Sequence, residues 1–171
     1  MLLRILIWLT CVCVSSHLAA QVQAPSSQQM IEQLKVPSTQ SIRTRSLRNL
    51  AVEAVPVPAR PSLSLLIQFD FNSARVRPES EQVLIDLAQA LQSVELQNST
   101  FAIEGHTDAK GNAYYNLKLS QQRAQAVSDL LQSKGINGNR LFASGKGASE
   151  LANVDQPFAA ENRRVRIVNL D

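Results

Sequence analysis

The apolar residues from position 63 onward follow first a two-residue repeat and then a helical repeat, and this order limits the folds open to the chain. The first segment alternates over nine residues, which predicts a strand over 63–71 with these apolar members: Leu63, Leu65, Ile67, Phe69 and Phe71. Pro78 suits the first turn of a helix, and apolar residues then recur at helical spacing as Leu84, Leu87, Ala88 and Leu91. The sequence therefore predicts an amphipathic helix over 78–93 after the strand.

The same two repeats return after this helix. Ser120 is a favourable N-cap for a second helix, whose apolar stripe continues until Gly135 ends it. A polar loop over 105–115 precedes that helix, and three short apolar segments have the length of strands: 100–104, 141–144 and 164–170. The predicted order is strand, helix, strand, helix, strand, strand.

This order of elements defines a fold class. A strand–helix–strand unit closes with a right-handed crossover, so the strands that it joins run parallel. Each predicted helix has one apolar stripe, which one face of a sheet is enough to cover. We therefore expect an α+β two-layer sandwich of β-α-β-α-β-β order, with two helices on one face of a four-stranded mixed sheet. Residues 61–171 are enough to bury a core of their own.

The first 20 residues have the pattern of a secretory signal peptide. Arg4 supplies the positive charge, residues 5–14 are almost wholly apolar, and small residues follow at Ala19 and Ala20. We expect cleavage after Ala20, with cleavage after Ala24 or a retained anchor as alternatives. The apolar run has about half of the roughly 20 residues that a membrane span needs. The pattern predicts export to the periplasm.

Both cysteines of the chain, Cys11 and Cys13, lie inside this leader, so the mature chain would have neither a disulfide nor a thiol. A lipoprotein needs a small residue directly before the cysteine that ends its apolar run. Thr10 and Val12 precede the two cysteines instead. We therefore do not expect a lipoprotein.

Residues 21–60 are rich in Gln, Ser, Pro and Arg, and we expect them to be a flexible, basic tether. They carry five basic and two acidic residues, whereas 61–171 carry 11 basic and 12 acidic ones. Met30–Leu34 could form one or two helical turns, but no longer repeat supports them. The tether is either a spacer or a segment that docks onto an acidic surface. A near-neutral domain with few aromatic residues argues against a nucleic-acid partner.

Residues able to bind or react gather between the second predicted strand and the second predicted helix. Asp108 in the loop and Arg123 near the predicted helix start could converge on one ligand, or form an ion pair that only joins loop to helix. Ser120, His106 and Asp108 are the residue types of a catalytic triad, but no Gly-x-Ser-x-Gly motif surrounds the serine. Glu104, His106 and Asp108 alternate, so a metal site is a further alternative. We expect no enzymatic activity, no metal and no cofactor.

Four separated motifs make residues 63–171 resemble the OmpA-like domain family. The opening motif is Phe69-Asp70-Phe71-Asn72 and the closing one is Asn162-Arg163-Arg164-Val165. Between them, the family spacing is matched by Thr107-Asp108, Gly111, Asn116, Leu119-Ser120 and Arg123-Ala124. The resemblance implies non-covalent binding of peptidoglycan through the diaminopimelate of its stem peptide. The same resemblance implies that the protein is associated with the cell wall or the outer membrane.

The resemblance also implies which residues hold the ligand. Asp108 would bind the ammonium of diaminopimelate and Arg123 its carboxylate, while six further residues would line the pocket: Phe71, Asn72, Thr107, Asn116, Leu119 and Arg164. The physical requirement agrees, because a zwitterion needs a fixed anion and a fixed cation, and the planar guanidinium suits a carboxylate. The alternative function is an envelope protein–protein adaptor that keeps the fold without binding the wall, with partners reached through 21–60.

Overall fold

The computed structural model describes residues 24–37 and 59–171. The expected signal peptide, and the parts of the expected tether over 21–23 and 38–58, lie outside the described residues. The helices and strands follow in this order: α1 Ser27–Leu34, β1 Ser62–Leu65, η1 Pro78–Ser80, α2 Glu81–Gln92, β2 Phe101–His106, α3 Ala113–Ser133, η2 Gly138–Arg140, β3 Leu141–Gly147, η3 Ala160–Asn162 and β4 Val165–Asn169.

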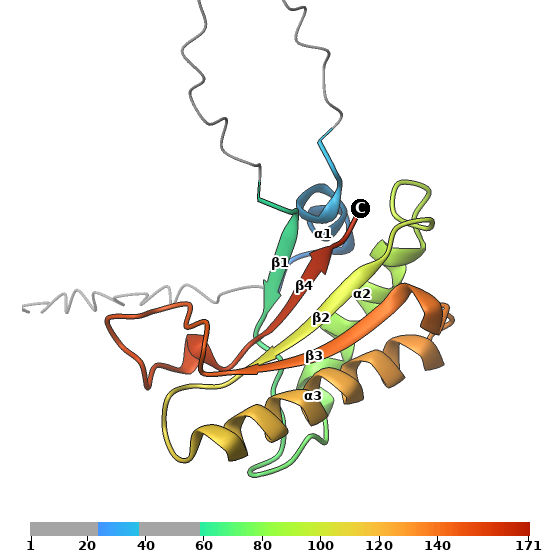
Figure 1. Cartoon of the computed structure of the whole chain (residues 1–171). Coiled ribbons are helices and arrows are strands. Elements are labelled where there is room, and N and C mark those ends of the chain that lie inside the picture. The colour runs from blue at the N-terminus through green and yellow to red at the C-terminus, as the bar shows by residue number, and fades with distance from the viewer. Residues whose placement is uncertain (1–23, 38–58) are drawn as a thin grey trace, which may run out of the picture.

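Four strands form one mixed sheet in the order β1-β4-β2-β3 (Figure 1). β4 is antiparallel to both β1 and β2, and β2 is parallel to β3. The predicted α+β class with a four-stranded mixed sheet is therefore confirmed. β1 and β2 run in the same direction, as the crossover rule requires, but β4 is inserted between them.

One face of the sheet carries the core. Ile103 of β2 lies opposite Ile167 of β4, which in turn lies opposite Leu63 of β1. These side chains belong to one buried cluster that also includes the apolar faces of α2 and α3, such as Leu87 and Val127. Most residues of the opposite face are polar or partly exposed, as the alternation of a strand requires, with buried Val168 as an exception. Both long helices therefore cover the same face, as the sequence predicted.

Helix α3 also closes the exposed edge of the sheet. The Gln121 amide donates to the carbonyl of Ala143 at 3.3 Å and accepts from the N–H of Gly145 at 2.6 Å, so one side chain pairs with β3 as a neighbouring strand would. The hydroxyl of Ser120 accepts from the N–H of Gly147 at 2.9 Å. Ser120 is thus a buried residue in the middle of α3, and its predicted role as N-cap is wrong. Asn112 caps the helix instead, because its side chain accepts from the N–H of Tyr115.

The first predicted strand is shorter than its alternating pattern. β1 ends at Leu65, and the chain then leaves the sheet to form a hairpin in which Phe69 pairs with Val76. Asn72 at the tip of this hairpin has a φ of 54°, a conformation that Asn tolerates better than most residues. Apolar and polar residues alternate both in a strand of a sheet and in the arm of a hairpin, so the sequence pattern could not show where β1 ends. The helix predicted over 78–93 is present as η1 and α2.

Residues 27–34 are not a flexible tether. They form helix α1, which begins with a capping box in which Ser26 and Gln29 each accept from the other's backbone N–H. Met30 and Leu34 are fully buried against α2 and β1, and the amide of Asn169 donates to the carbonyl of Leu34 at 2.9 Å. Figure 1 shows α1 beside β1 and the end of β4. The short apolar stripe is sufficient because tertiary packing stabilises it.

Within residues 24–37 and 59–171, no helix combines the length and the apolar character that a membrane crossing requires.

Candidate functional site

A hollow of about 540 Å³ lies where the hairpin tip, the loop after β2 and the first turns of α3 meet. Seven of the eight residues predicted to hold the ligand line it: Phe71, Asn72, Thr107, Asp108, Asn116, Leu119 and Arg123. The sequence did not identify five others in its wall: Phe69, Asp70, Lys110, Tyr115 and Arg163. We call this hollow the clamp pocket.

The loop after β2 is held by hydrogen bonds on both sides. The N–H of Thr107 donates to the carbonyl of Gly147 at 2.8 Å, and that of Ala109 donates to the carbonyl of Pro157 at 2.9 Å. The amide of Asn116, which is buried in the first turn of α3, donates to the carbonyls of Asp108 and Lys110 at 3.3 and 3.0 Å. These contacts fix the backbone that carries Asp108, as a preorganised site requires.

Asp108 is a largely buried anion with a defined partner. Its Oδ1 accepts from the N–H of Lys110 at 3.2 Å, and its Oδ2 accepts from Arg163 Nη1 at 2.8 Å. The side chain is 15% exposed, so protein rather than water surrounds most of it. An ionised carboxylate has about four lone-pair positions, so both oxygens can still accept a ligand ammonium.

Arg123 carries a half-buried positive charge in the middle of α3. It is not near the helix start, because α3 begins ten residues earlier, at Ala113. Its Nε donates to the carbonyl of Ser73 at 3.1 Å, and its Cζ lies 4.8 Å from the centre of the Phe69 ring. Burial, opposed in part by neighbouring Tyr115, lowers the pKa of Arg123 below its usual value. The group remains charged, because an arginine is not deprotonated in a protein.

The expected alternative of an Asp108–Arg123 ion pair does not occur. Among the residues that the structure describes, Arg123 forms no ion pair with any carboxylate, whereas Asp108 pairs with Arg163. Both charged groups nevertheless line the same hollow. The pocket therefore offers an anion held by the protein and a cation that has no carboxylate partner in the described chain.

Phe71, Asn72 and Tyr115 form the rim of the clamp pocket. The Tyr115 hydroxyl donates to Oδ1 of Asn72, which ties the hairpin tip to α3. Phe71 directly precedes Asn72 at the tip and is completely exposed. A fully exposed aromatic side chain next to a pocket is available to a ligand, since it contributes nothing to the core.

Arg164 does not line the clamp pocket, so the structure does not bring it together with the other predicted residues. Its Nη2 donates to the carbonyl of Glu150 at 3.1 Å, and burial lowers its pKa. Arg163, which directly follows η3, is the arginine of this pair that reaches Asp108. Neighbouring residues in extended chain point in opposite directions, and the sequence motif alone did not show which one faces the pocket.

The residues of the two rival sites have structural contacts. The hydroxyl of Ser120 donates to the carbonyl of Leu117 at 2.7 Å and accepts from the N–H of Gly147, so it joins α3 to β3. The side chain of His106 is fully buried, and burial, reinforced by nearby Arg164, lowers its pKa to about 4. In the described part of the chain, no group of three His, Cys, Asp or Glu side chains is placed to hold a metal ion.

Comparison with known proteins supports the resemblance to the OmpA-like family. The model of the OmpA family matches residues 68–165. Outer membrane protein A of Bordetella avium is 37% identical over 114 residues, which is 66% of this chain and 58% of that protein. Outer membrane protein A of Klebsiella aerogenes is 39% identical over 84 residues, 49% of this chain and 24% of the relative. This chain thus matches less than two thirds of the length of either relative.

Solved structures share the fold as well. The cell wall anchor of the T6SS from Pseudomonas aeruginosa has a TM-score of 0.53 at 32% identity, covering 66% of this chain and 82% of that one. The peptidoglycan-associated lipoprotein from Burkholderia pseudomallei has a TM-score of 0.52, also at 32% identity, covering 62% and 88%. The family match spans more than half of the chain and includes every wall residue of the clamp pocket, and the chain therefore belongs to the OmpA family.

Proposed function

We propose that this protein binds peptidoglycan non-covalently, through the diaminopimelate of the stem peptide, and so anchors or organises the bacterial cell envelope. The observation that carries the proposal is the clamp pocket, in which Arg123 has no carboxylate partner among the described residues while Asp108 lies in the same wall. The names of the similar structures, a cell wall anchor and a peptidoglycan-associated lipoprotein, support it.

The clamp would hold the free amino-acid end of diaminopimelate by its two charges. The ligand ammonium donates to the oxygens of Asp108, and the ligand carboxylate accepts two parallel hydrogen bonds from the guanidinium of Arg123. Thr107 lines the same wall, and its buried hydroxyl has no hydrogen-bond partner among the described residues. The size of the hollow falls within the range of about 300–1,000 Å³ of small-molecule sites.

Partial burial increases the strength of this recognition. The pKa of Arg123 is lowered because water is partly excluded from the guanidinium, and an ion pair formed there is screened less than one at the surface. The Arg163–Asp108 contact fixes the carboxylate before the ligand arrives. The protein thus avoids part of the entropy cost of ordering the site on binding.

The proposed location is the periplasm, at the cell wall or outer membrane, after export by the signal peptide and without a lipid anchor. The proposed role requires no chemistry on the ligand, so we propose a binding module rather than an enzyme.

Co-sedimentation with purified diaminopimelate-type sacculi tests this function. Wild-type protein should sediment with the sacculi, and Asp108→Ala and Arg123→Ala should not. Arg75→Ala is the matched control, because Arg75 lies on the same hairpin as the pocket wall and has an exposed side chain, whose one ion pair in the described chain is a 3.9 Å contact to Asp70. Wild-type protein that stays in solution with the sacculi would contradict the proposal and favour the adaptor alternative.

A further inference from the structure

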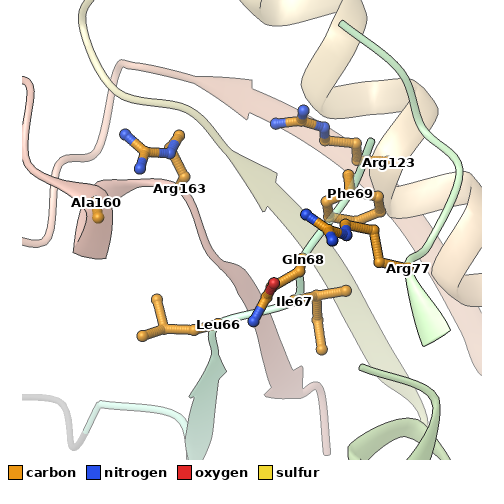
Figure 2. Close-up of a pocket in the computed structure, with 8 residues that line it drawn as sticks. All are labelled: Leu66, Ile67, Gln68, Phe69, Arg77, Arg123, Ala160 and Arg163. Carbon is orange, nitrogen blue, oxygen red and sulfur yellow. The ribbon is translucent and has the colours of Figure 1, made fainter. Parts of the chain in front are cut away.

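A second hollow of about 330 Å³ adjoins the clamp pocket and shares three of its wall residues, Phe69, Arg123 and Arg163 (Figure 2). Its other wall residues are Leu66, Ile67, Gln68, Arg77 and Ala160. We call it the arginine hollow. Figure 2 shows Arg77 and Arg123 on one side of it, near Phe69, and Arg163 with Ala160 on the other.

The wall of the arginine hollow is strongly positive. It contains three guanidinium groups and no carboxylate among the described residues. Arg77 is paired with Glu79 at 3.1 Å, but both side chains are about half exposed, so water screens this contact. Arg163 is paired with Asp108 at 2.8 Å, so Arg123 is the one guanidinium of the three that has no carboxylate partner in the described chain. Arg163 also helps to lower the pKa of Arg123, because two like charges close together repel each other. An anion in the hollow would relieve this repulsion.

The hairpin holds Arg77 in a fixed position. Its N–H donates to the carbonyl of Gln68 at 2.9 Å, and the N–H of Gln68 donates to the hydroxyl of Ser80 at 2.8 Å. Phe69 and Val76 pair beside them. The backbone that carries the Arg77 side chain is therefore held by a hydrogen bond to Gln68, another wall residue of the hollow.

Apart from the amide of Gln68, the remaining wall is apolar. Leu66, Ile67 and Ala160 offer carbon atoms beside the three guanidinium groups. A ligand that fits has a carboxylate next to a small apolar group. In the peptidoglycan stem, the D-alanine that follows diaminopimelate has both features when it ends the chain. The free α-carboxylate of the D-glutamate before diaminopimelate supplies the same anion without the methyl group.

We propose that the arginine hollow is a second subsite, which binds another carboxylate of the wall peptide held by the clamp. This proposal rests on the proposed function, because the two hollows share Arg123 and would be occupied by one peptide. Arg77 lies outside the clamp pocket and is the residue through which the second subsite can be tested separately.

Calorimetric titration with three stem peptides tests the proposal. The peptides are a tripeptide ending in diaminopimelate, the tetrapeptide with terminal D-alanine, and that tetrapeptide with D-isoglutamine in place of D-glutamate. Wild-type protein should bind the tetrapeptide about tenfold more tightly than Arg77→Gln does, since one partly exposed charged hydrogen bond is lost. Arg75→Gln, which removes the same charge from the same hairpin, should bind as wild type.

The pattern across the peptides identifies the source of the carboxylate. If D-alanine supplies it, Arg77→Gln should leave the tripeptide affinity unchanged. If D-glutamate supplies it, amidation should abolish the effect of Arg77→Gln on the tetrapeptide. Ala160→Leu, at an exposed position of the wall, should fill the hollow and reproduce the loss without disturbing the core.

Arg77→Gln that binds all three peptides as wild type does, or that weakens all three only as much as Arg75→Gln, would overturn the second subsite. The clamp could still be correct in that case, because Asp108→Ala and Arg123→Ala would still abolish binding. Wild-type protein that binds none of the peptides would instead contradict the proposed function on which the subsite depends.

Discussion

Shortening Leu34 should destabilise the domain, although this residue lies in a segment whose composition is typical of a tether. Leu34 is fully buried, its carbonyl accepts from Asn169, and its helix contacts both α2 and β1. Truncation of a buried leucine to alanine removes transfer free energy and leaves a cavity, at a cost of about 2–5 kcal/mol. We therefore expect Leu34→Ala to lower the free energy of unfolding by about 2–4 kcal/mol.

The loss of stability has an upper limit, because a sufficiently weakened α1 is expected to detach from the domain as a unit. Met30 packs in the same cluster, so Met30→Ala should have an effect of similar size. Once α1 has undocked, a second truncation costs nothing more, so the double variant should lose less than the sum of the two single losses. This non-additivity distinguishes a docked helix from two independent core positions.

Urea unfolding followed by circular dichroism measures these differences. Gln33→Ala is the matched control, because Gln33 neighbours Leu34 in the same helix and is exposed; its effect should stay within about 0.5 kcal/mol. Leu34→Ala should lower the urea midpoint well below that of the control. Equal midpoints for Leu34→Ala and Gln33→Ala would refute the docking of α1.

Two further predictions concern the packing of α3 and the buried histidine. Gly105→Ala would place a Cβ 2.1 Å from the carbonyl oxygen of Ser120, so it should cost about 1–3 kcal/mol or more in thermal unfolding. Gly111→Ala meets no atom within 4 Å and should cost about 1–2 kcal/mol, through its φ of +94° alone. A melting temperature of Gly105→Ala equal to that of wild type would contradict the close approach of α3. His106 has a pKa of about 4 in the folded protein against an ordinary value near 6.5, so the unfolded chain binds the proton first and stability should fall as pH decreases from about 6.5 to about 4. His106→Gln should flatten this slope, and an NMR titration that places the His106 pKa above 6.5 would show the sign to be wrong.

The fold was predictable where one pattern has one structural meaning. The stripe of Leu84, Leu87 and Leu91 predicted α2, because no other element has that period. The alternation over 63–71 has two meanings, and the structure divides it between β1 and a hairpin arm. Helix α1 is only eight residues long and has three buried residues, Met30, Ile31 and Leu34. Its stability depends on a surface that forms elsewhere in the chain.

The sequence predicted several residues that line the site, but not which of them pair with one another. The motif resemblance identified Asp108 and Arg123, and the structure brings both to one hollow. It could not show that Asp108 pairs with Arg163 rather than Arg123, since that depends on which residue of the Arg163-Arg164 pair faces the loop. Ser120 has the residue type of a cap, but its hydroxyl is needed at the sheet edge, and the cap is made by Asn112.

The charge clamp is tested most directly by titrating wild-type protein and Arg123→Ala with two soluble tripeptides that differ only in diaminopimelate or lysine at the third position. Lysine lacks the second carboxylate, which is the group that Arg123 would bind. Removing one partner of a desolvated charge pair costs about 2–5 kcal/mol. Wild-type protein should therefore prefer the diaminopimelate peptide by at least about 30-fold, and Arg123→Ala should lose that preference while it unfolds at a temperature close to that of wild type. Equal affinity of the wild type for the two peptides, or an undiminished preference in Arg123→Ala, would contradict the clamp.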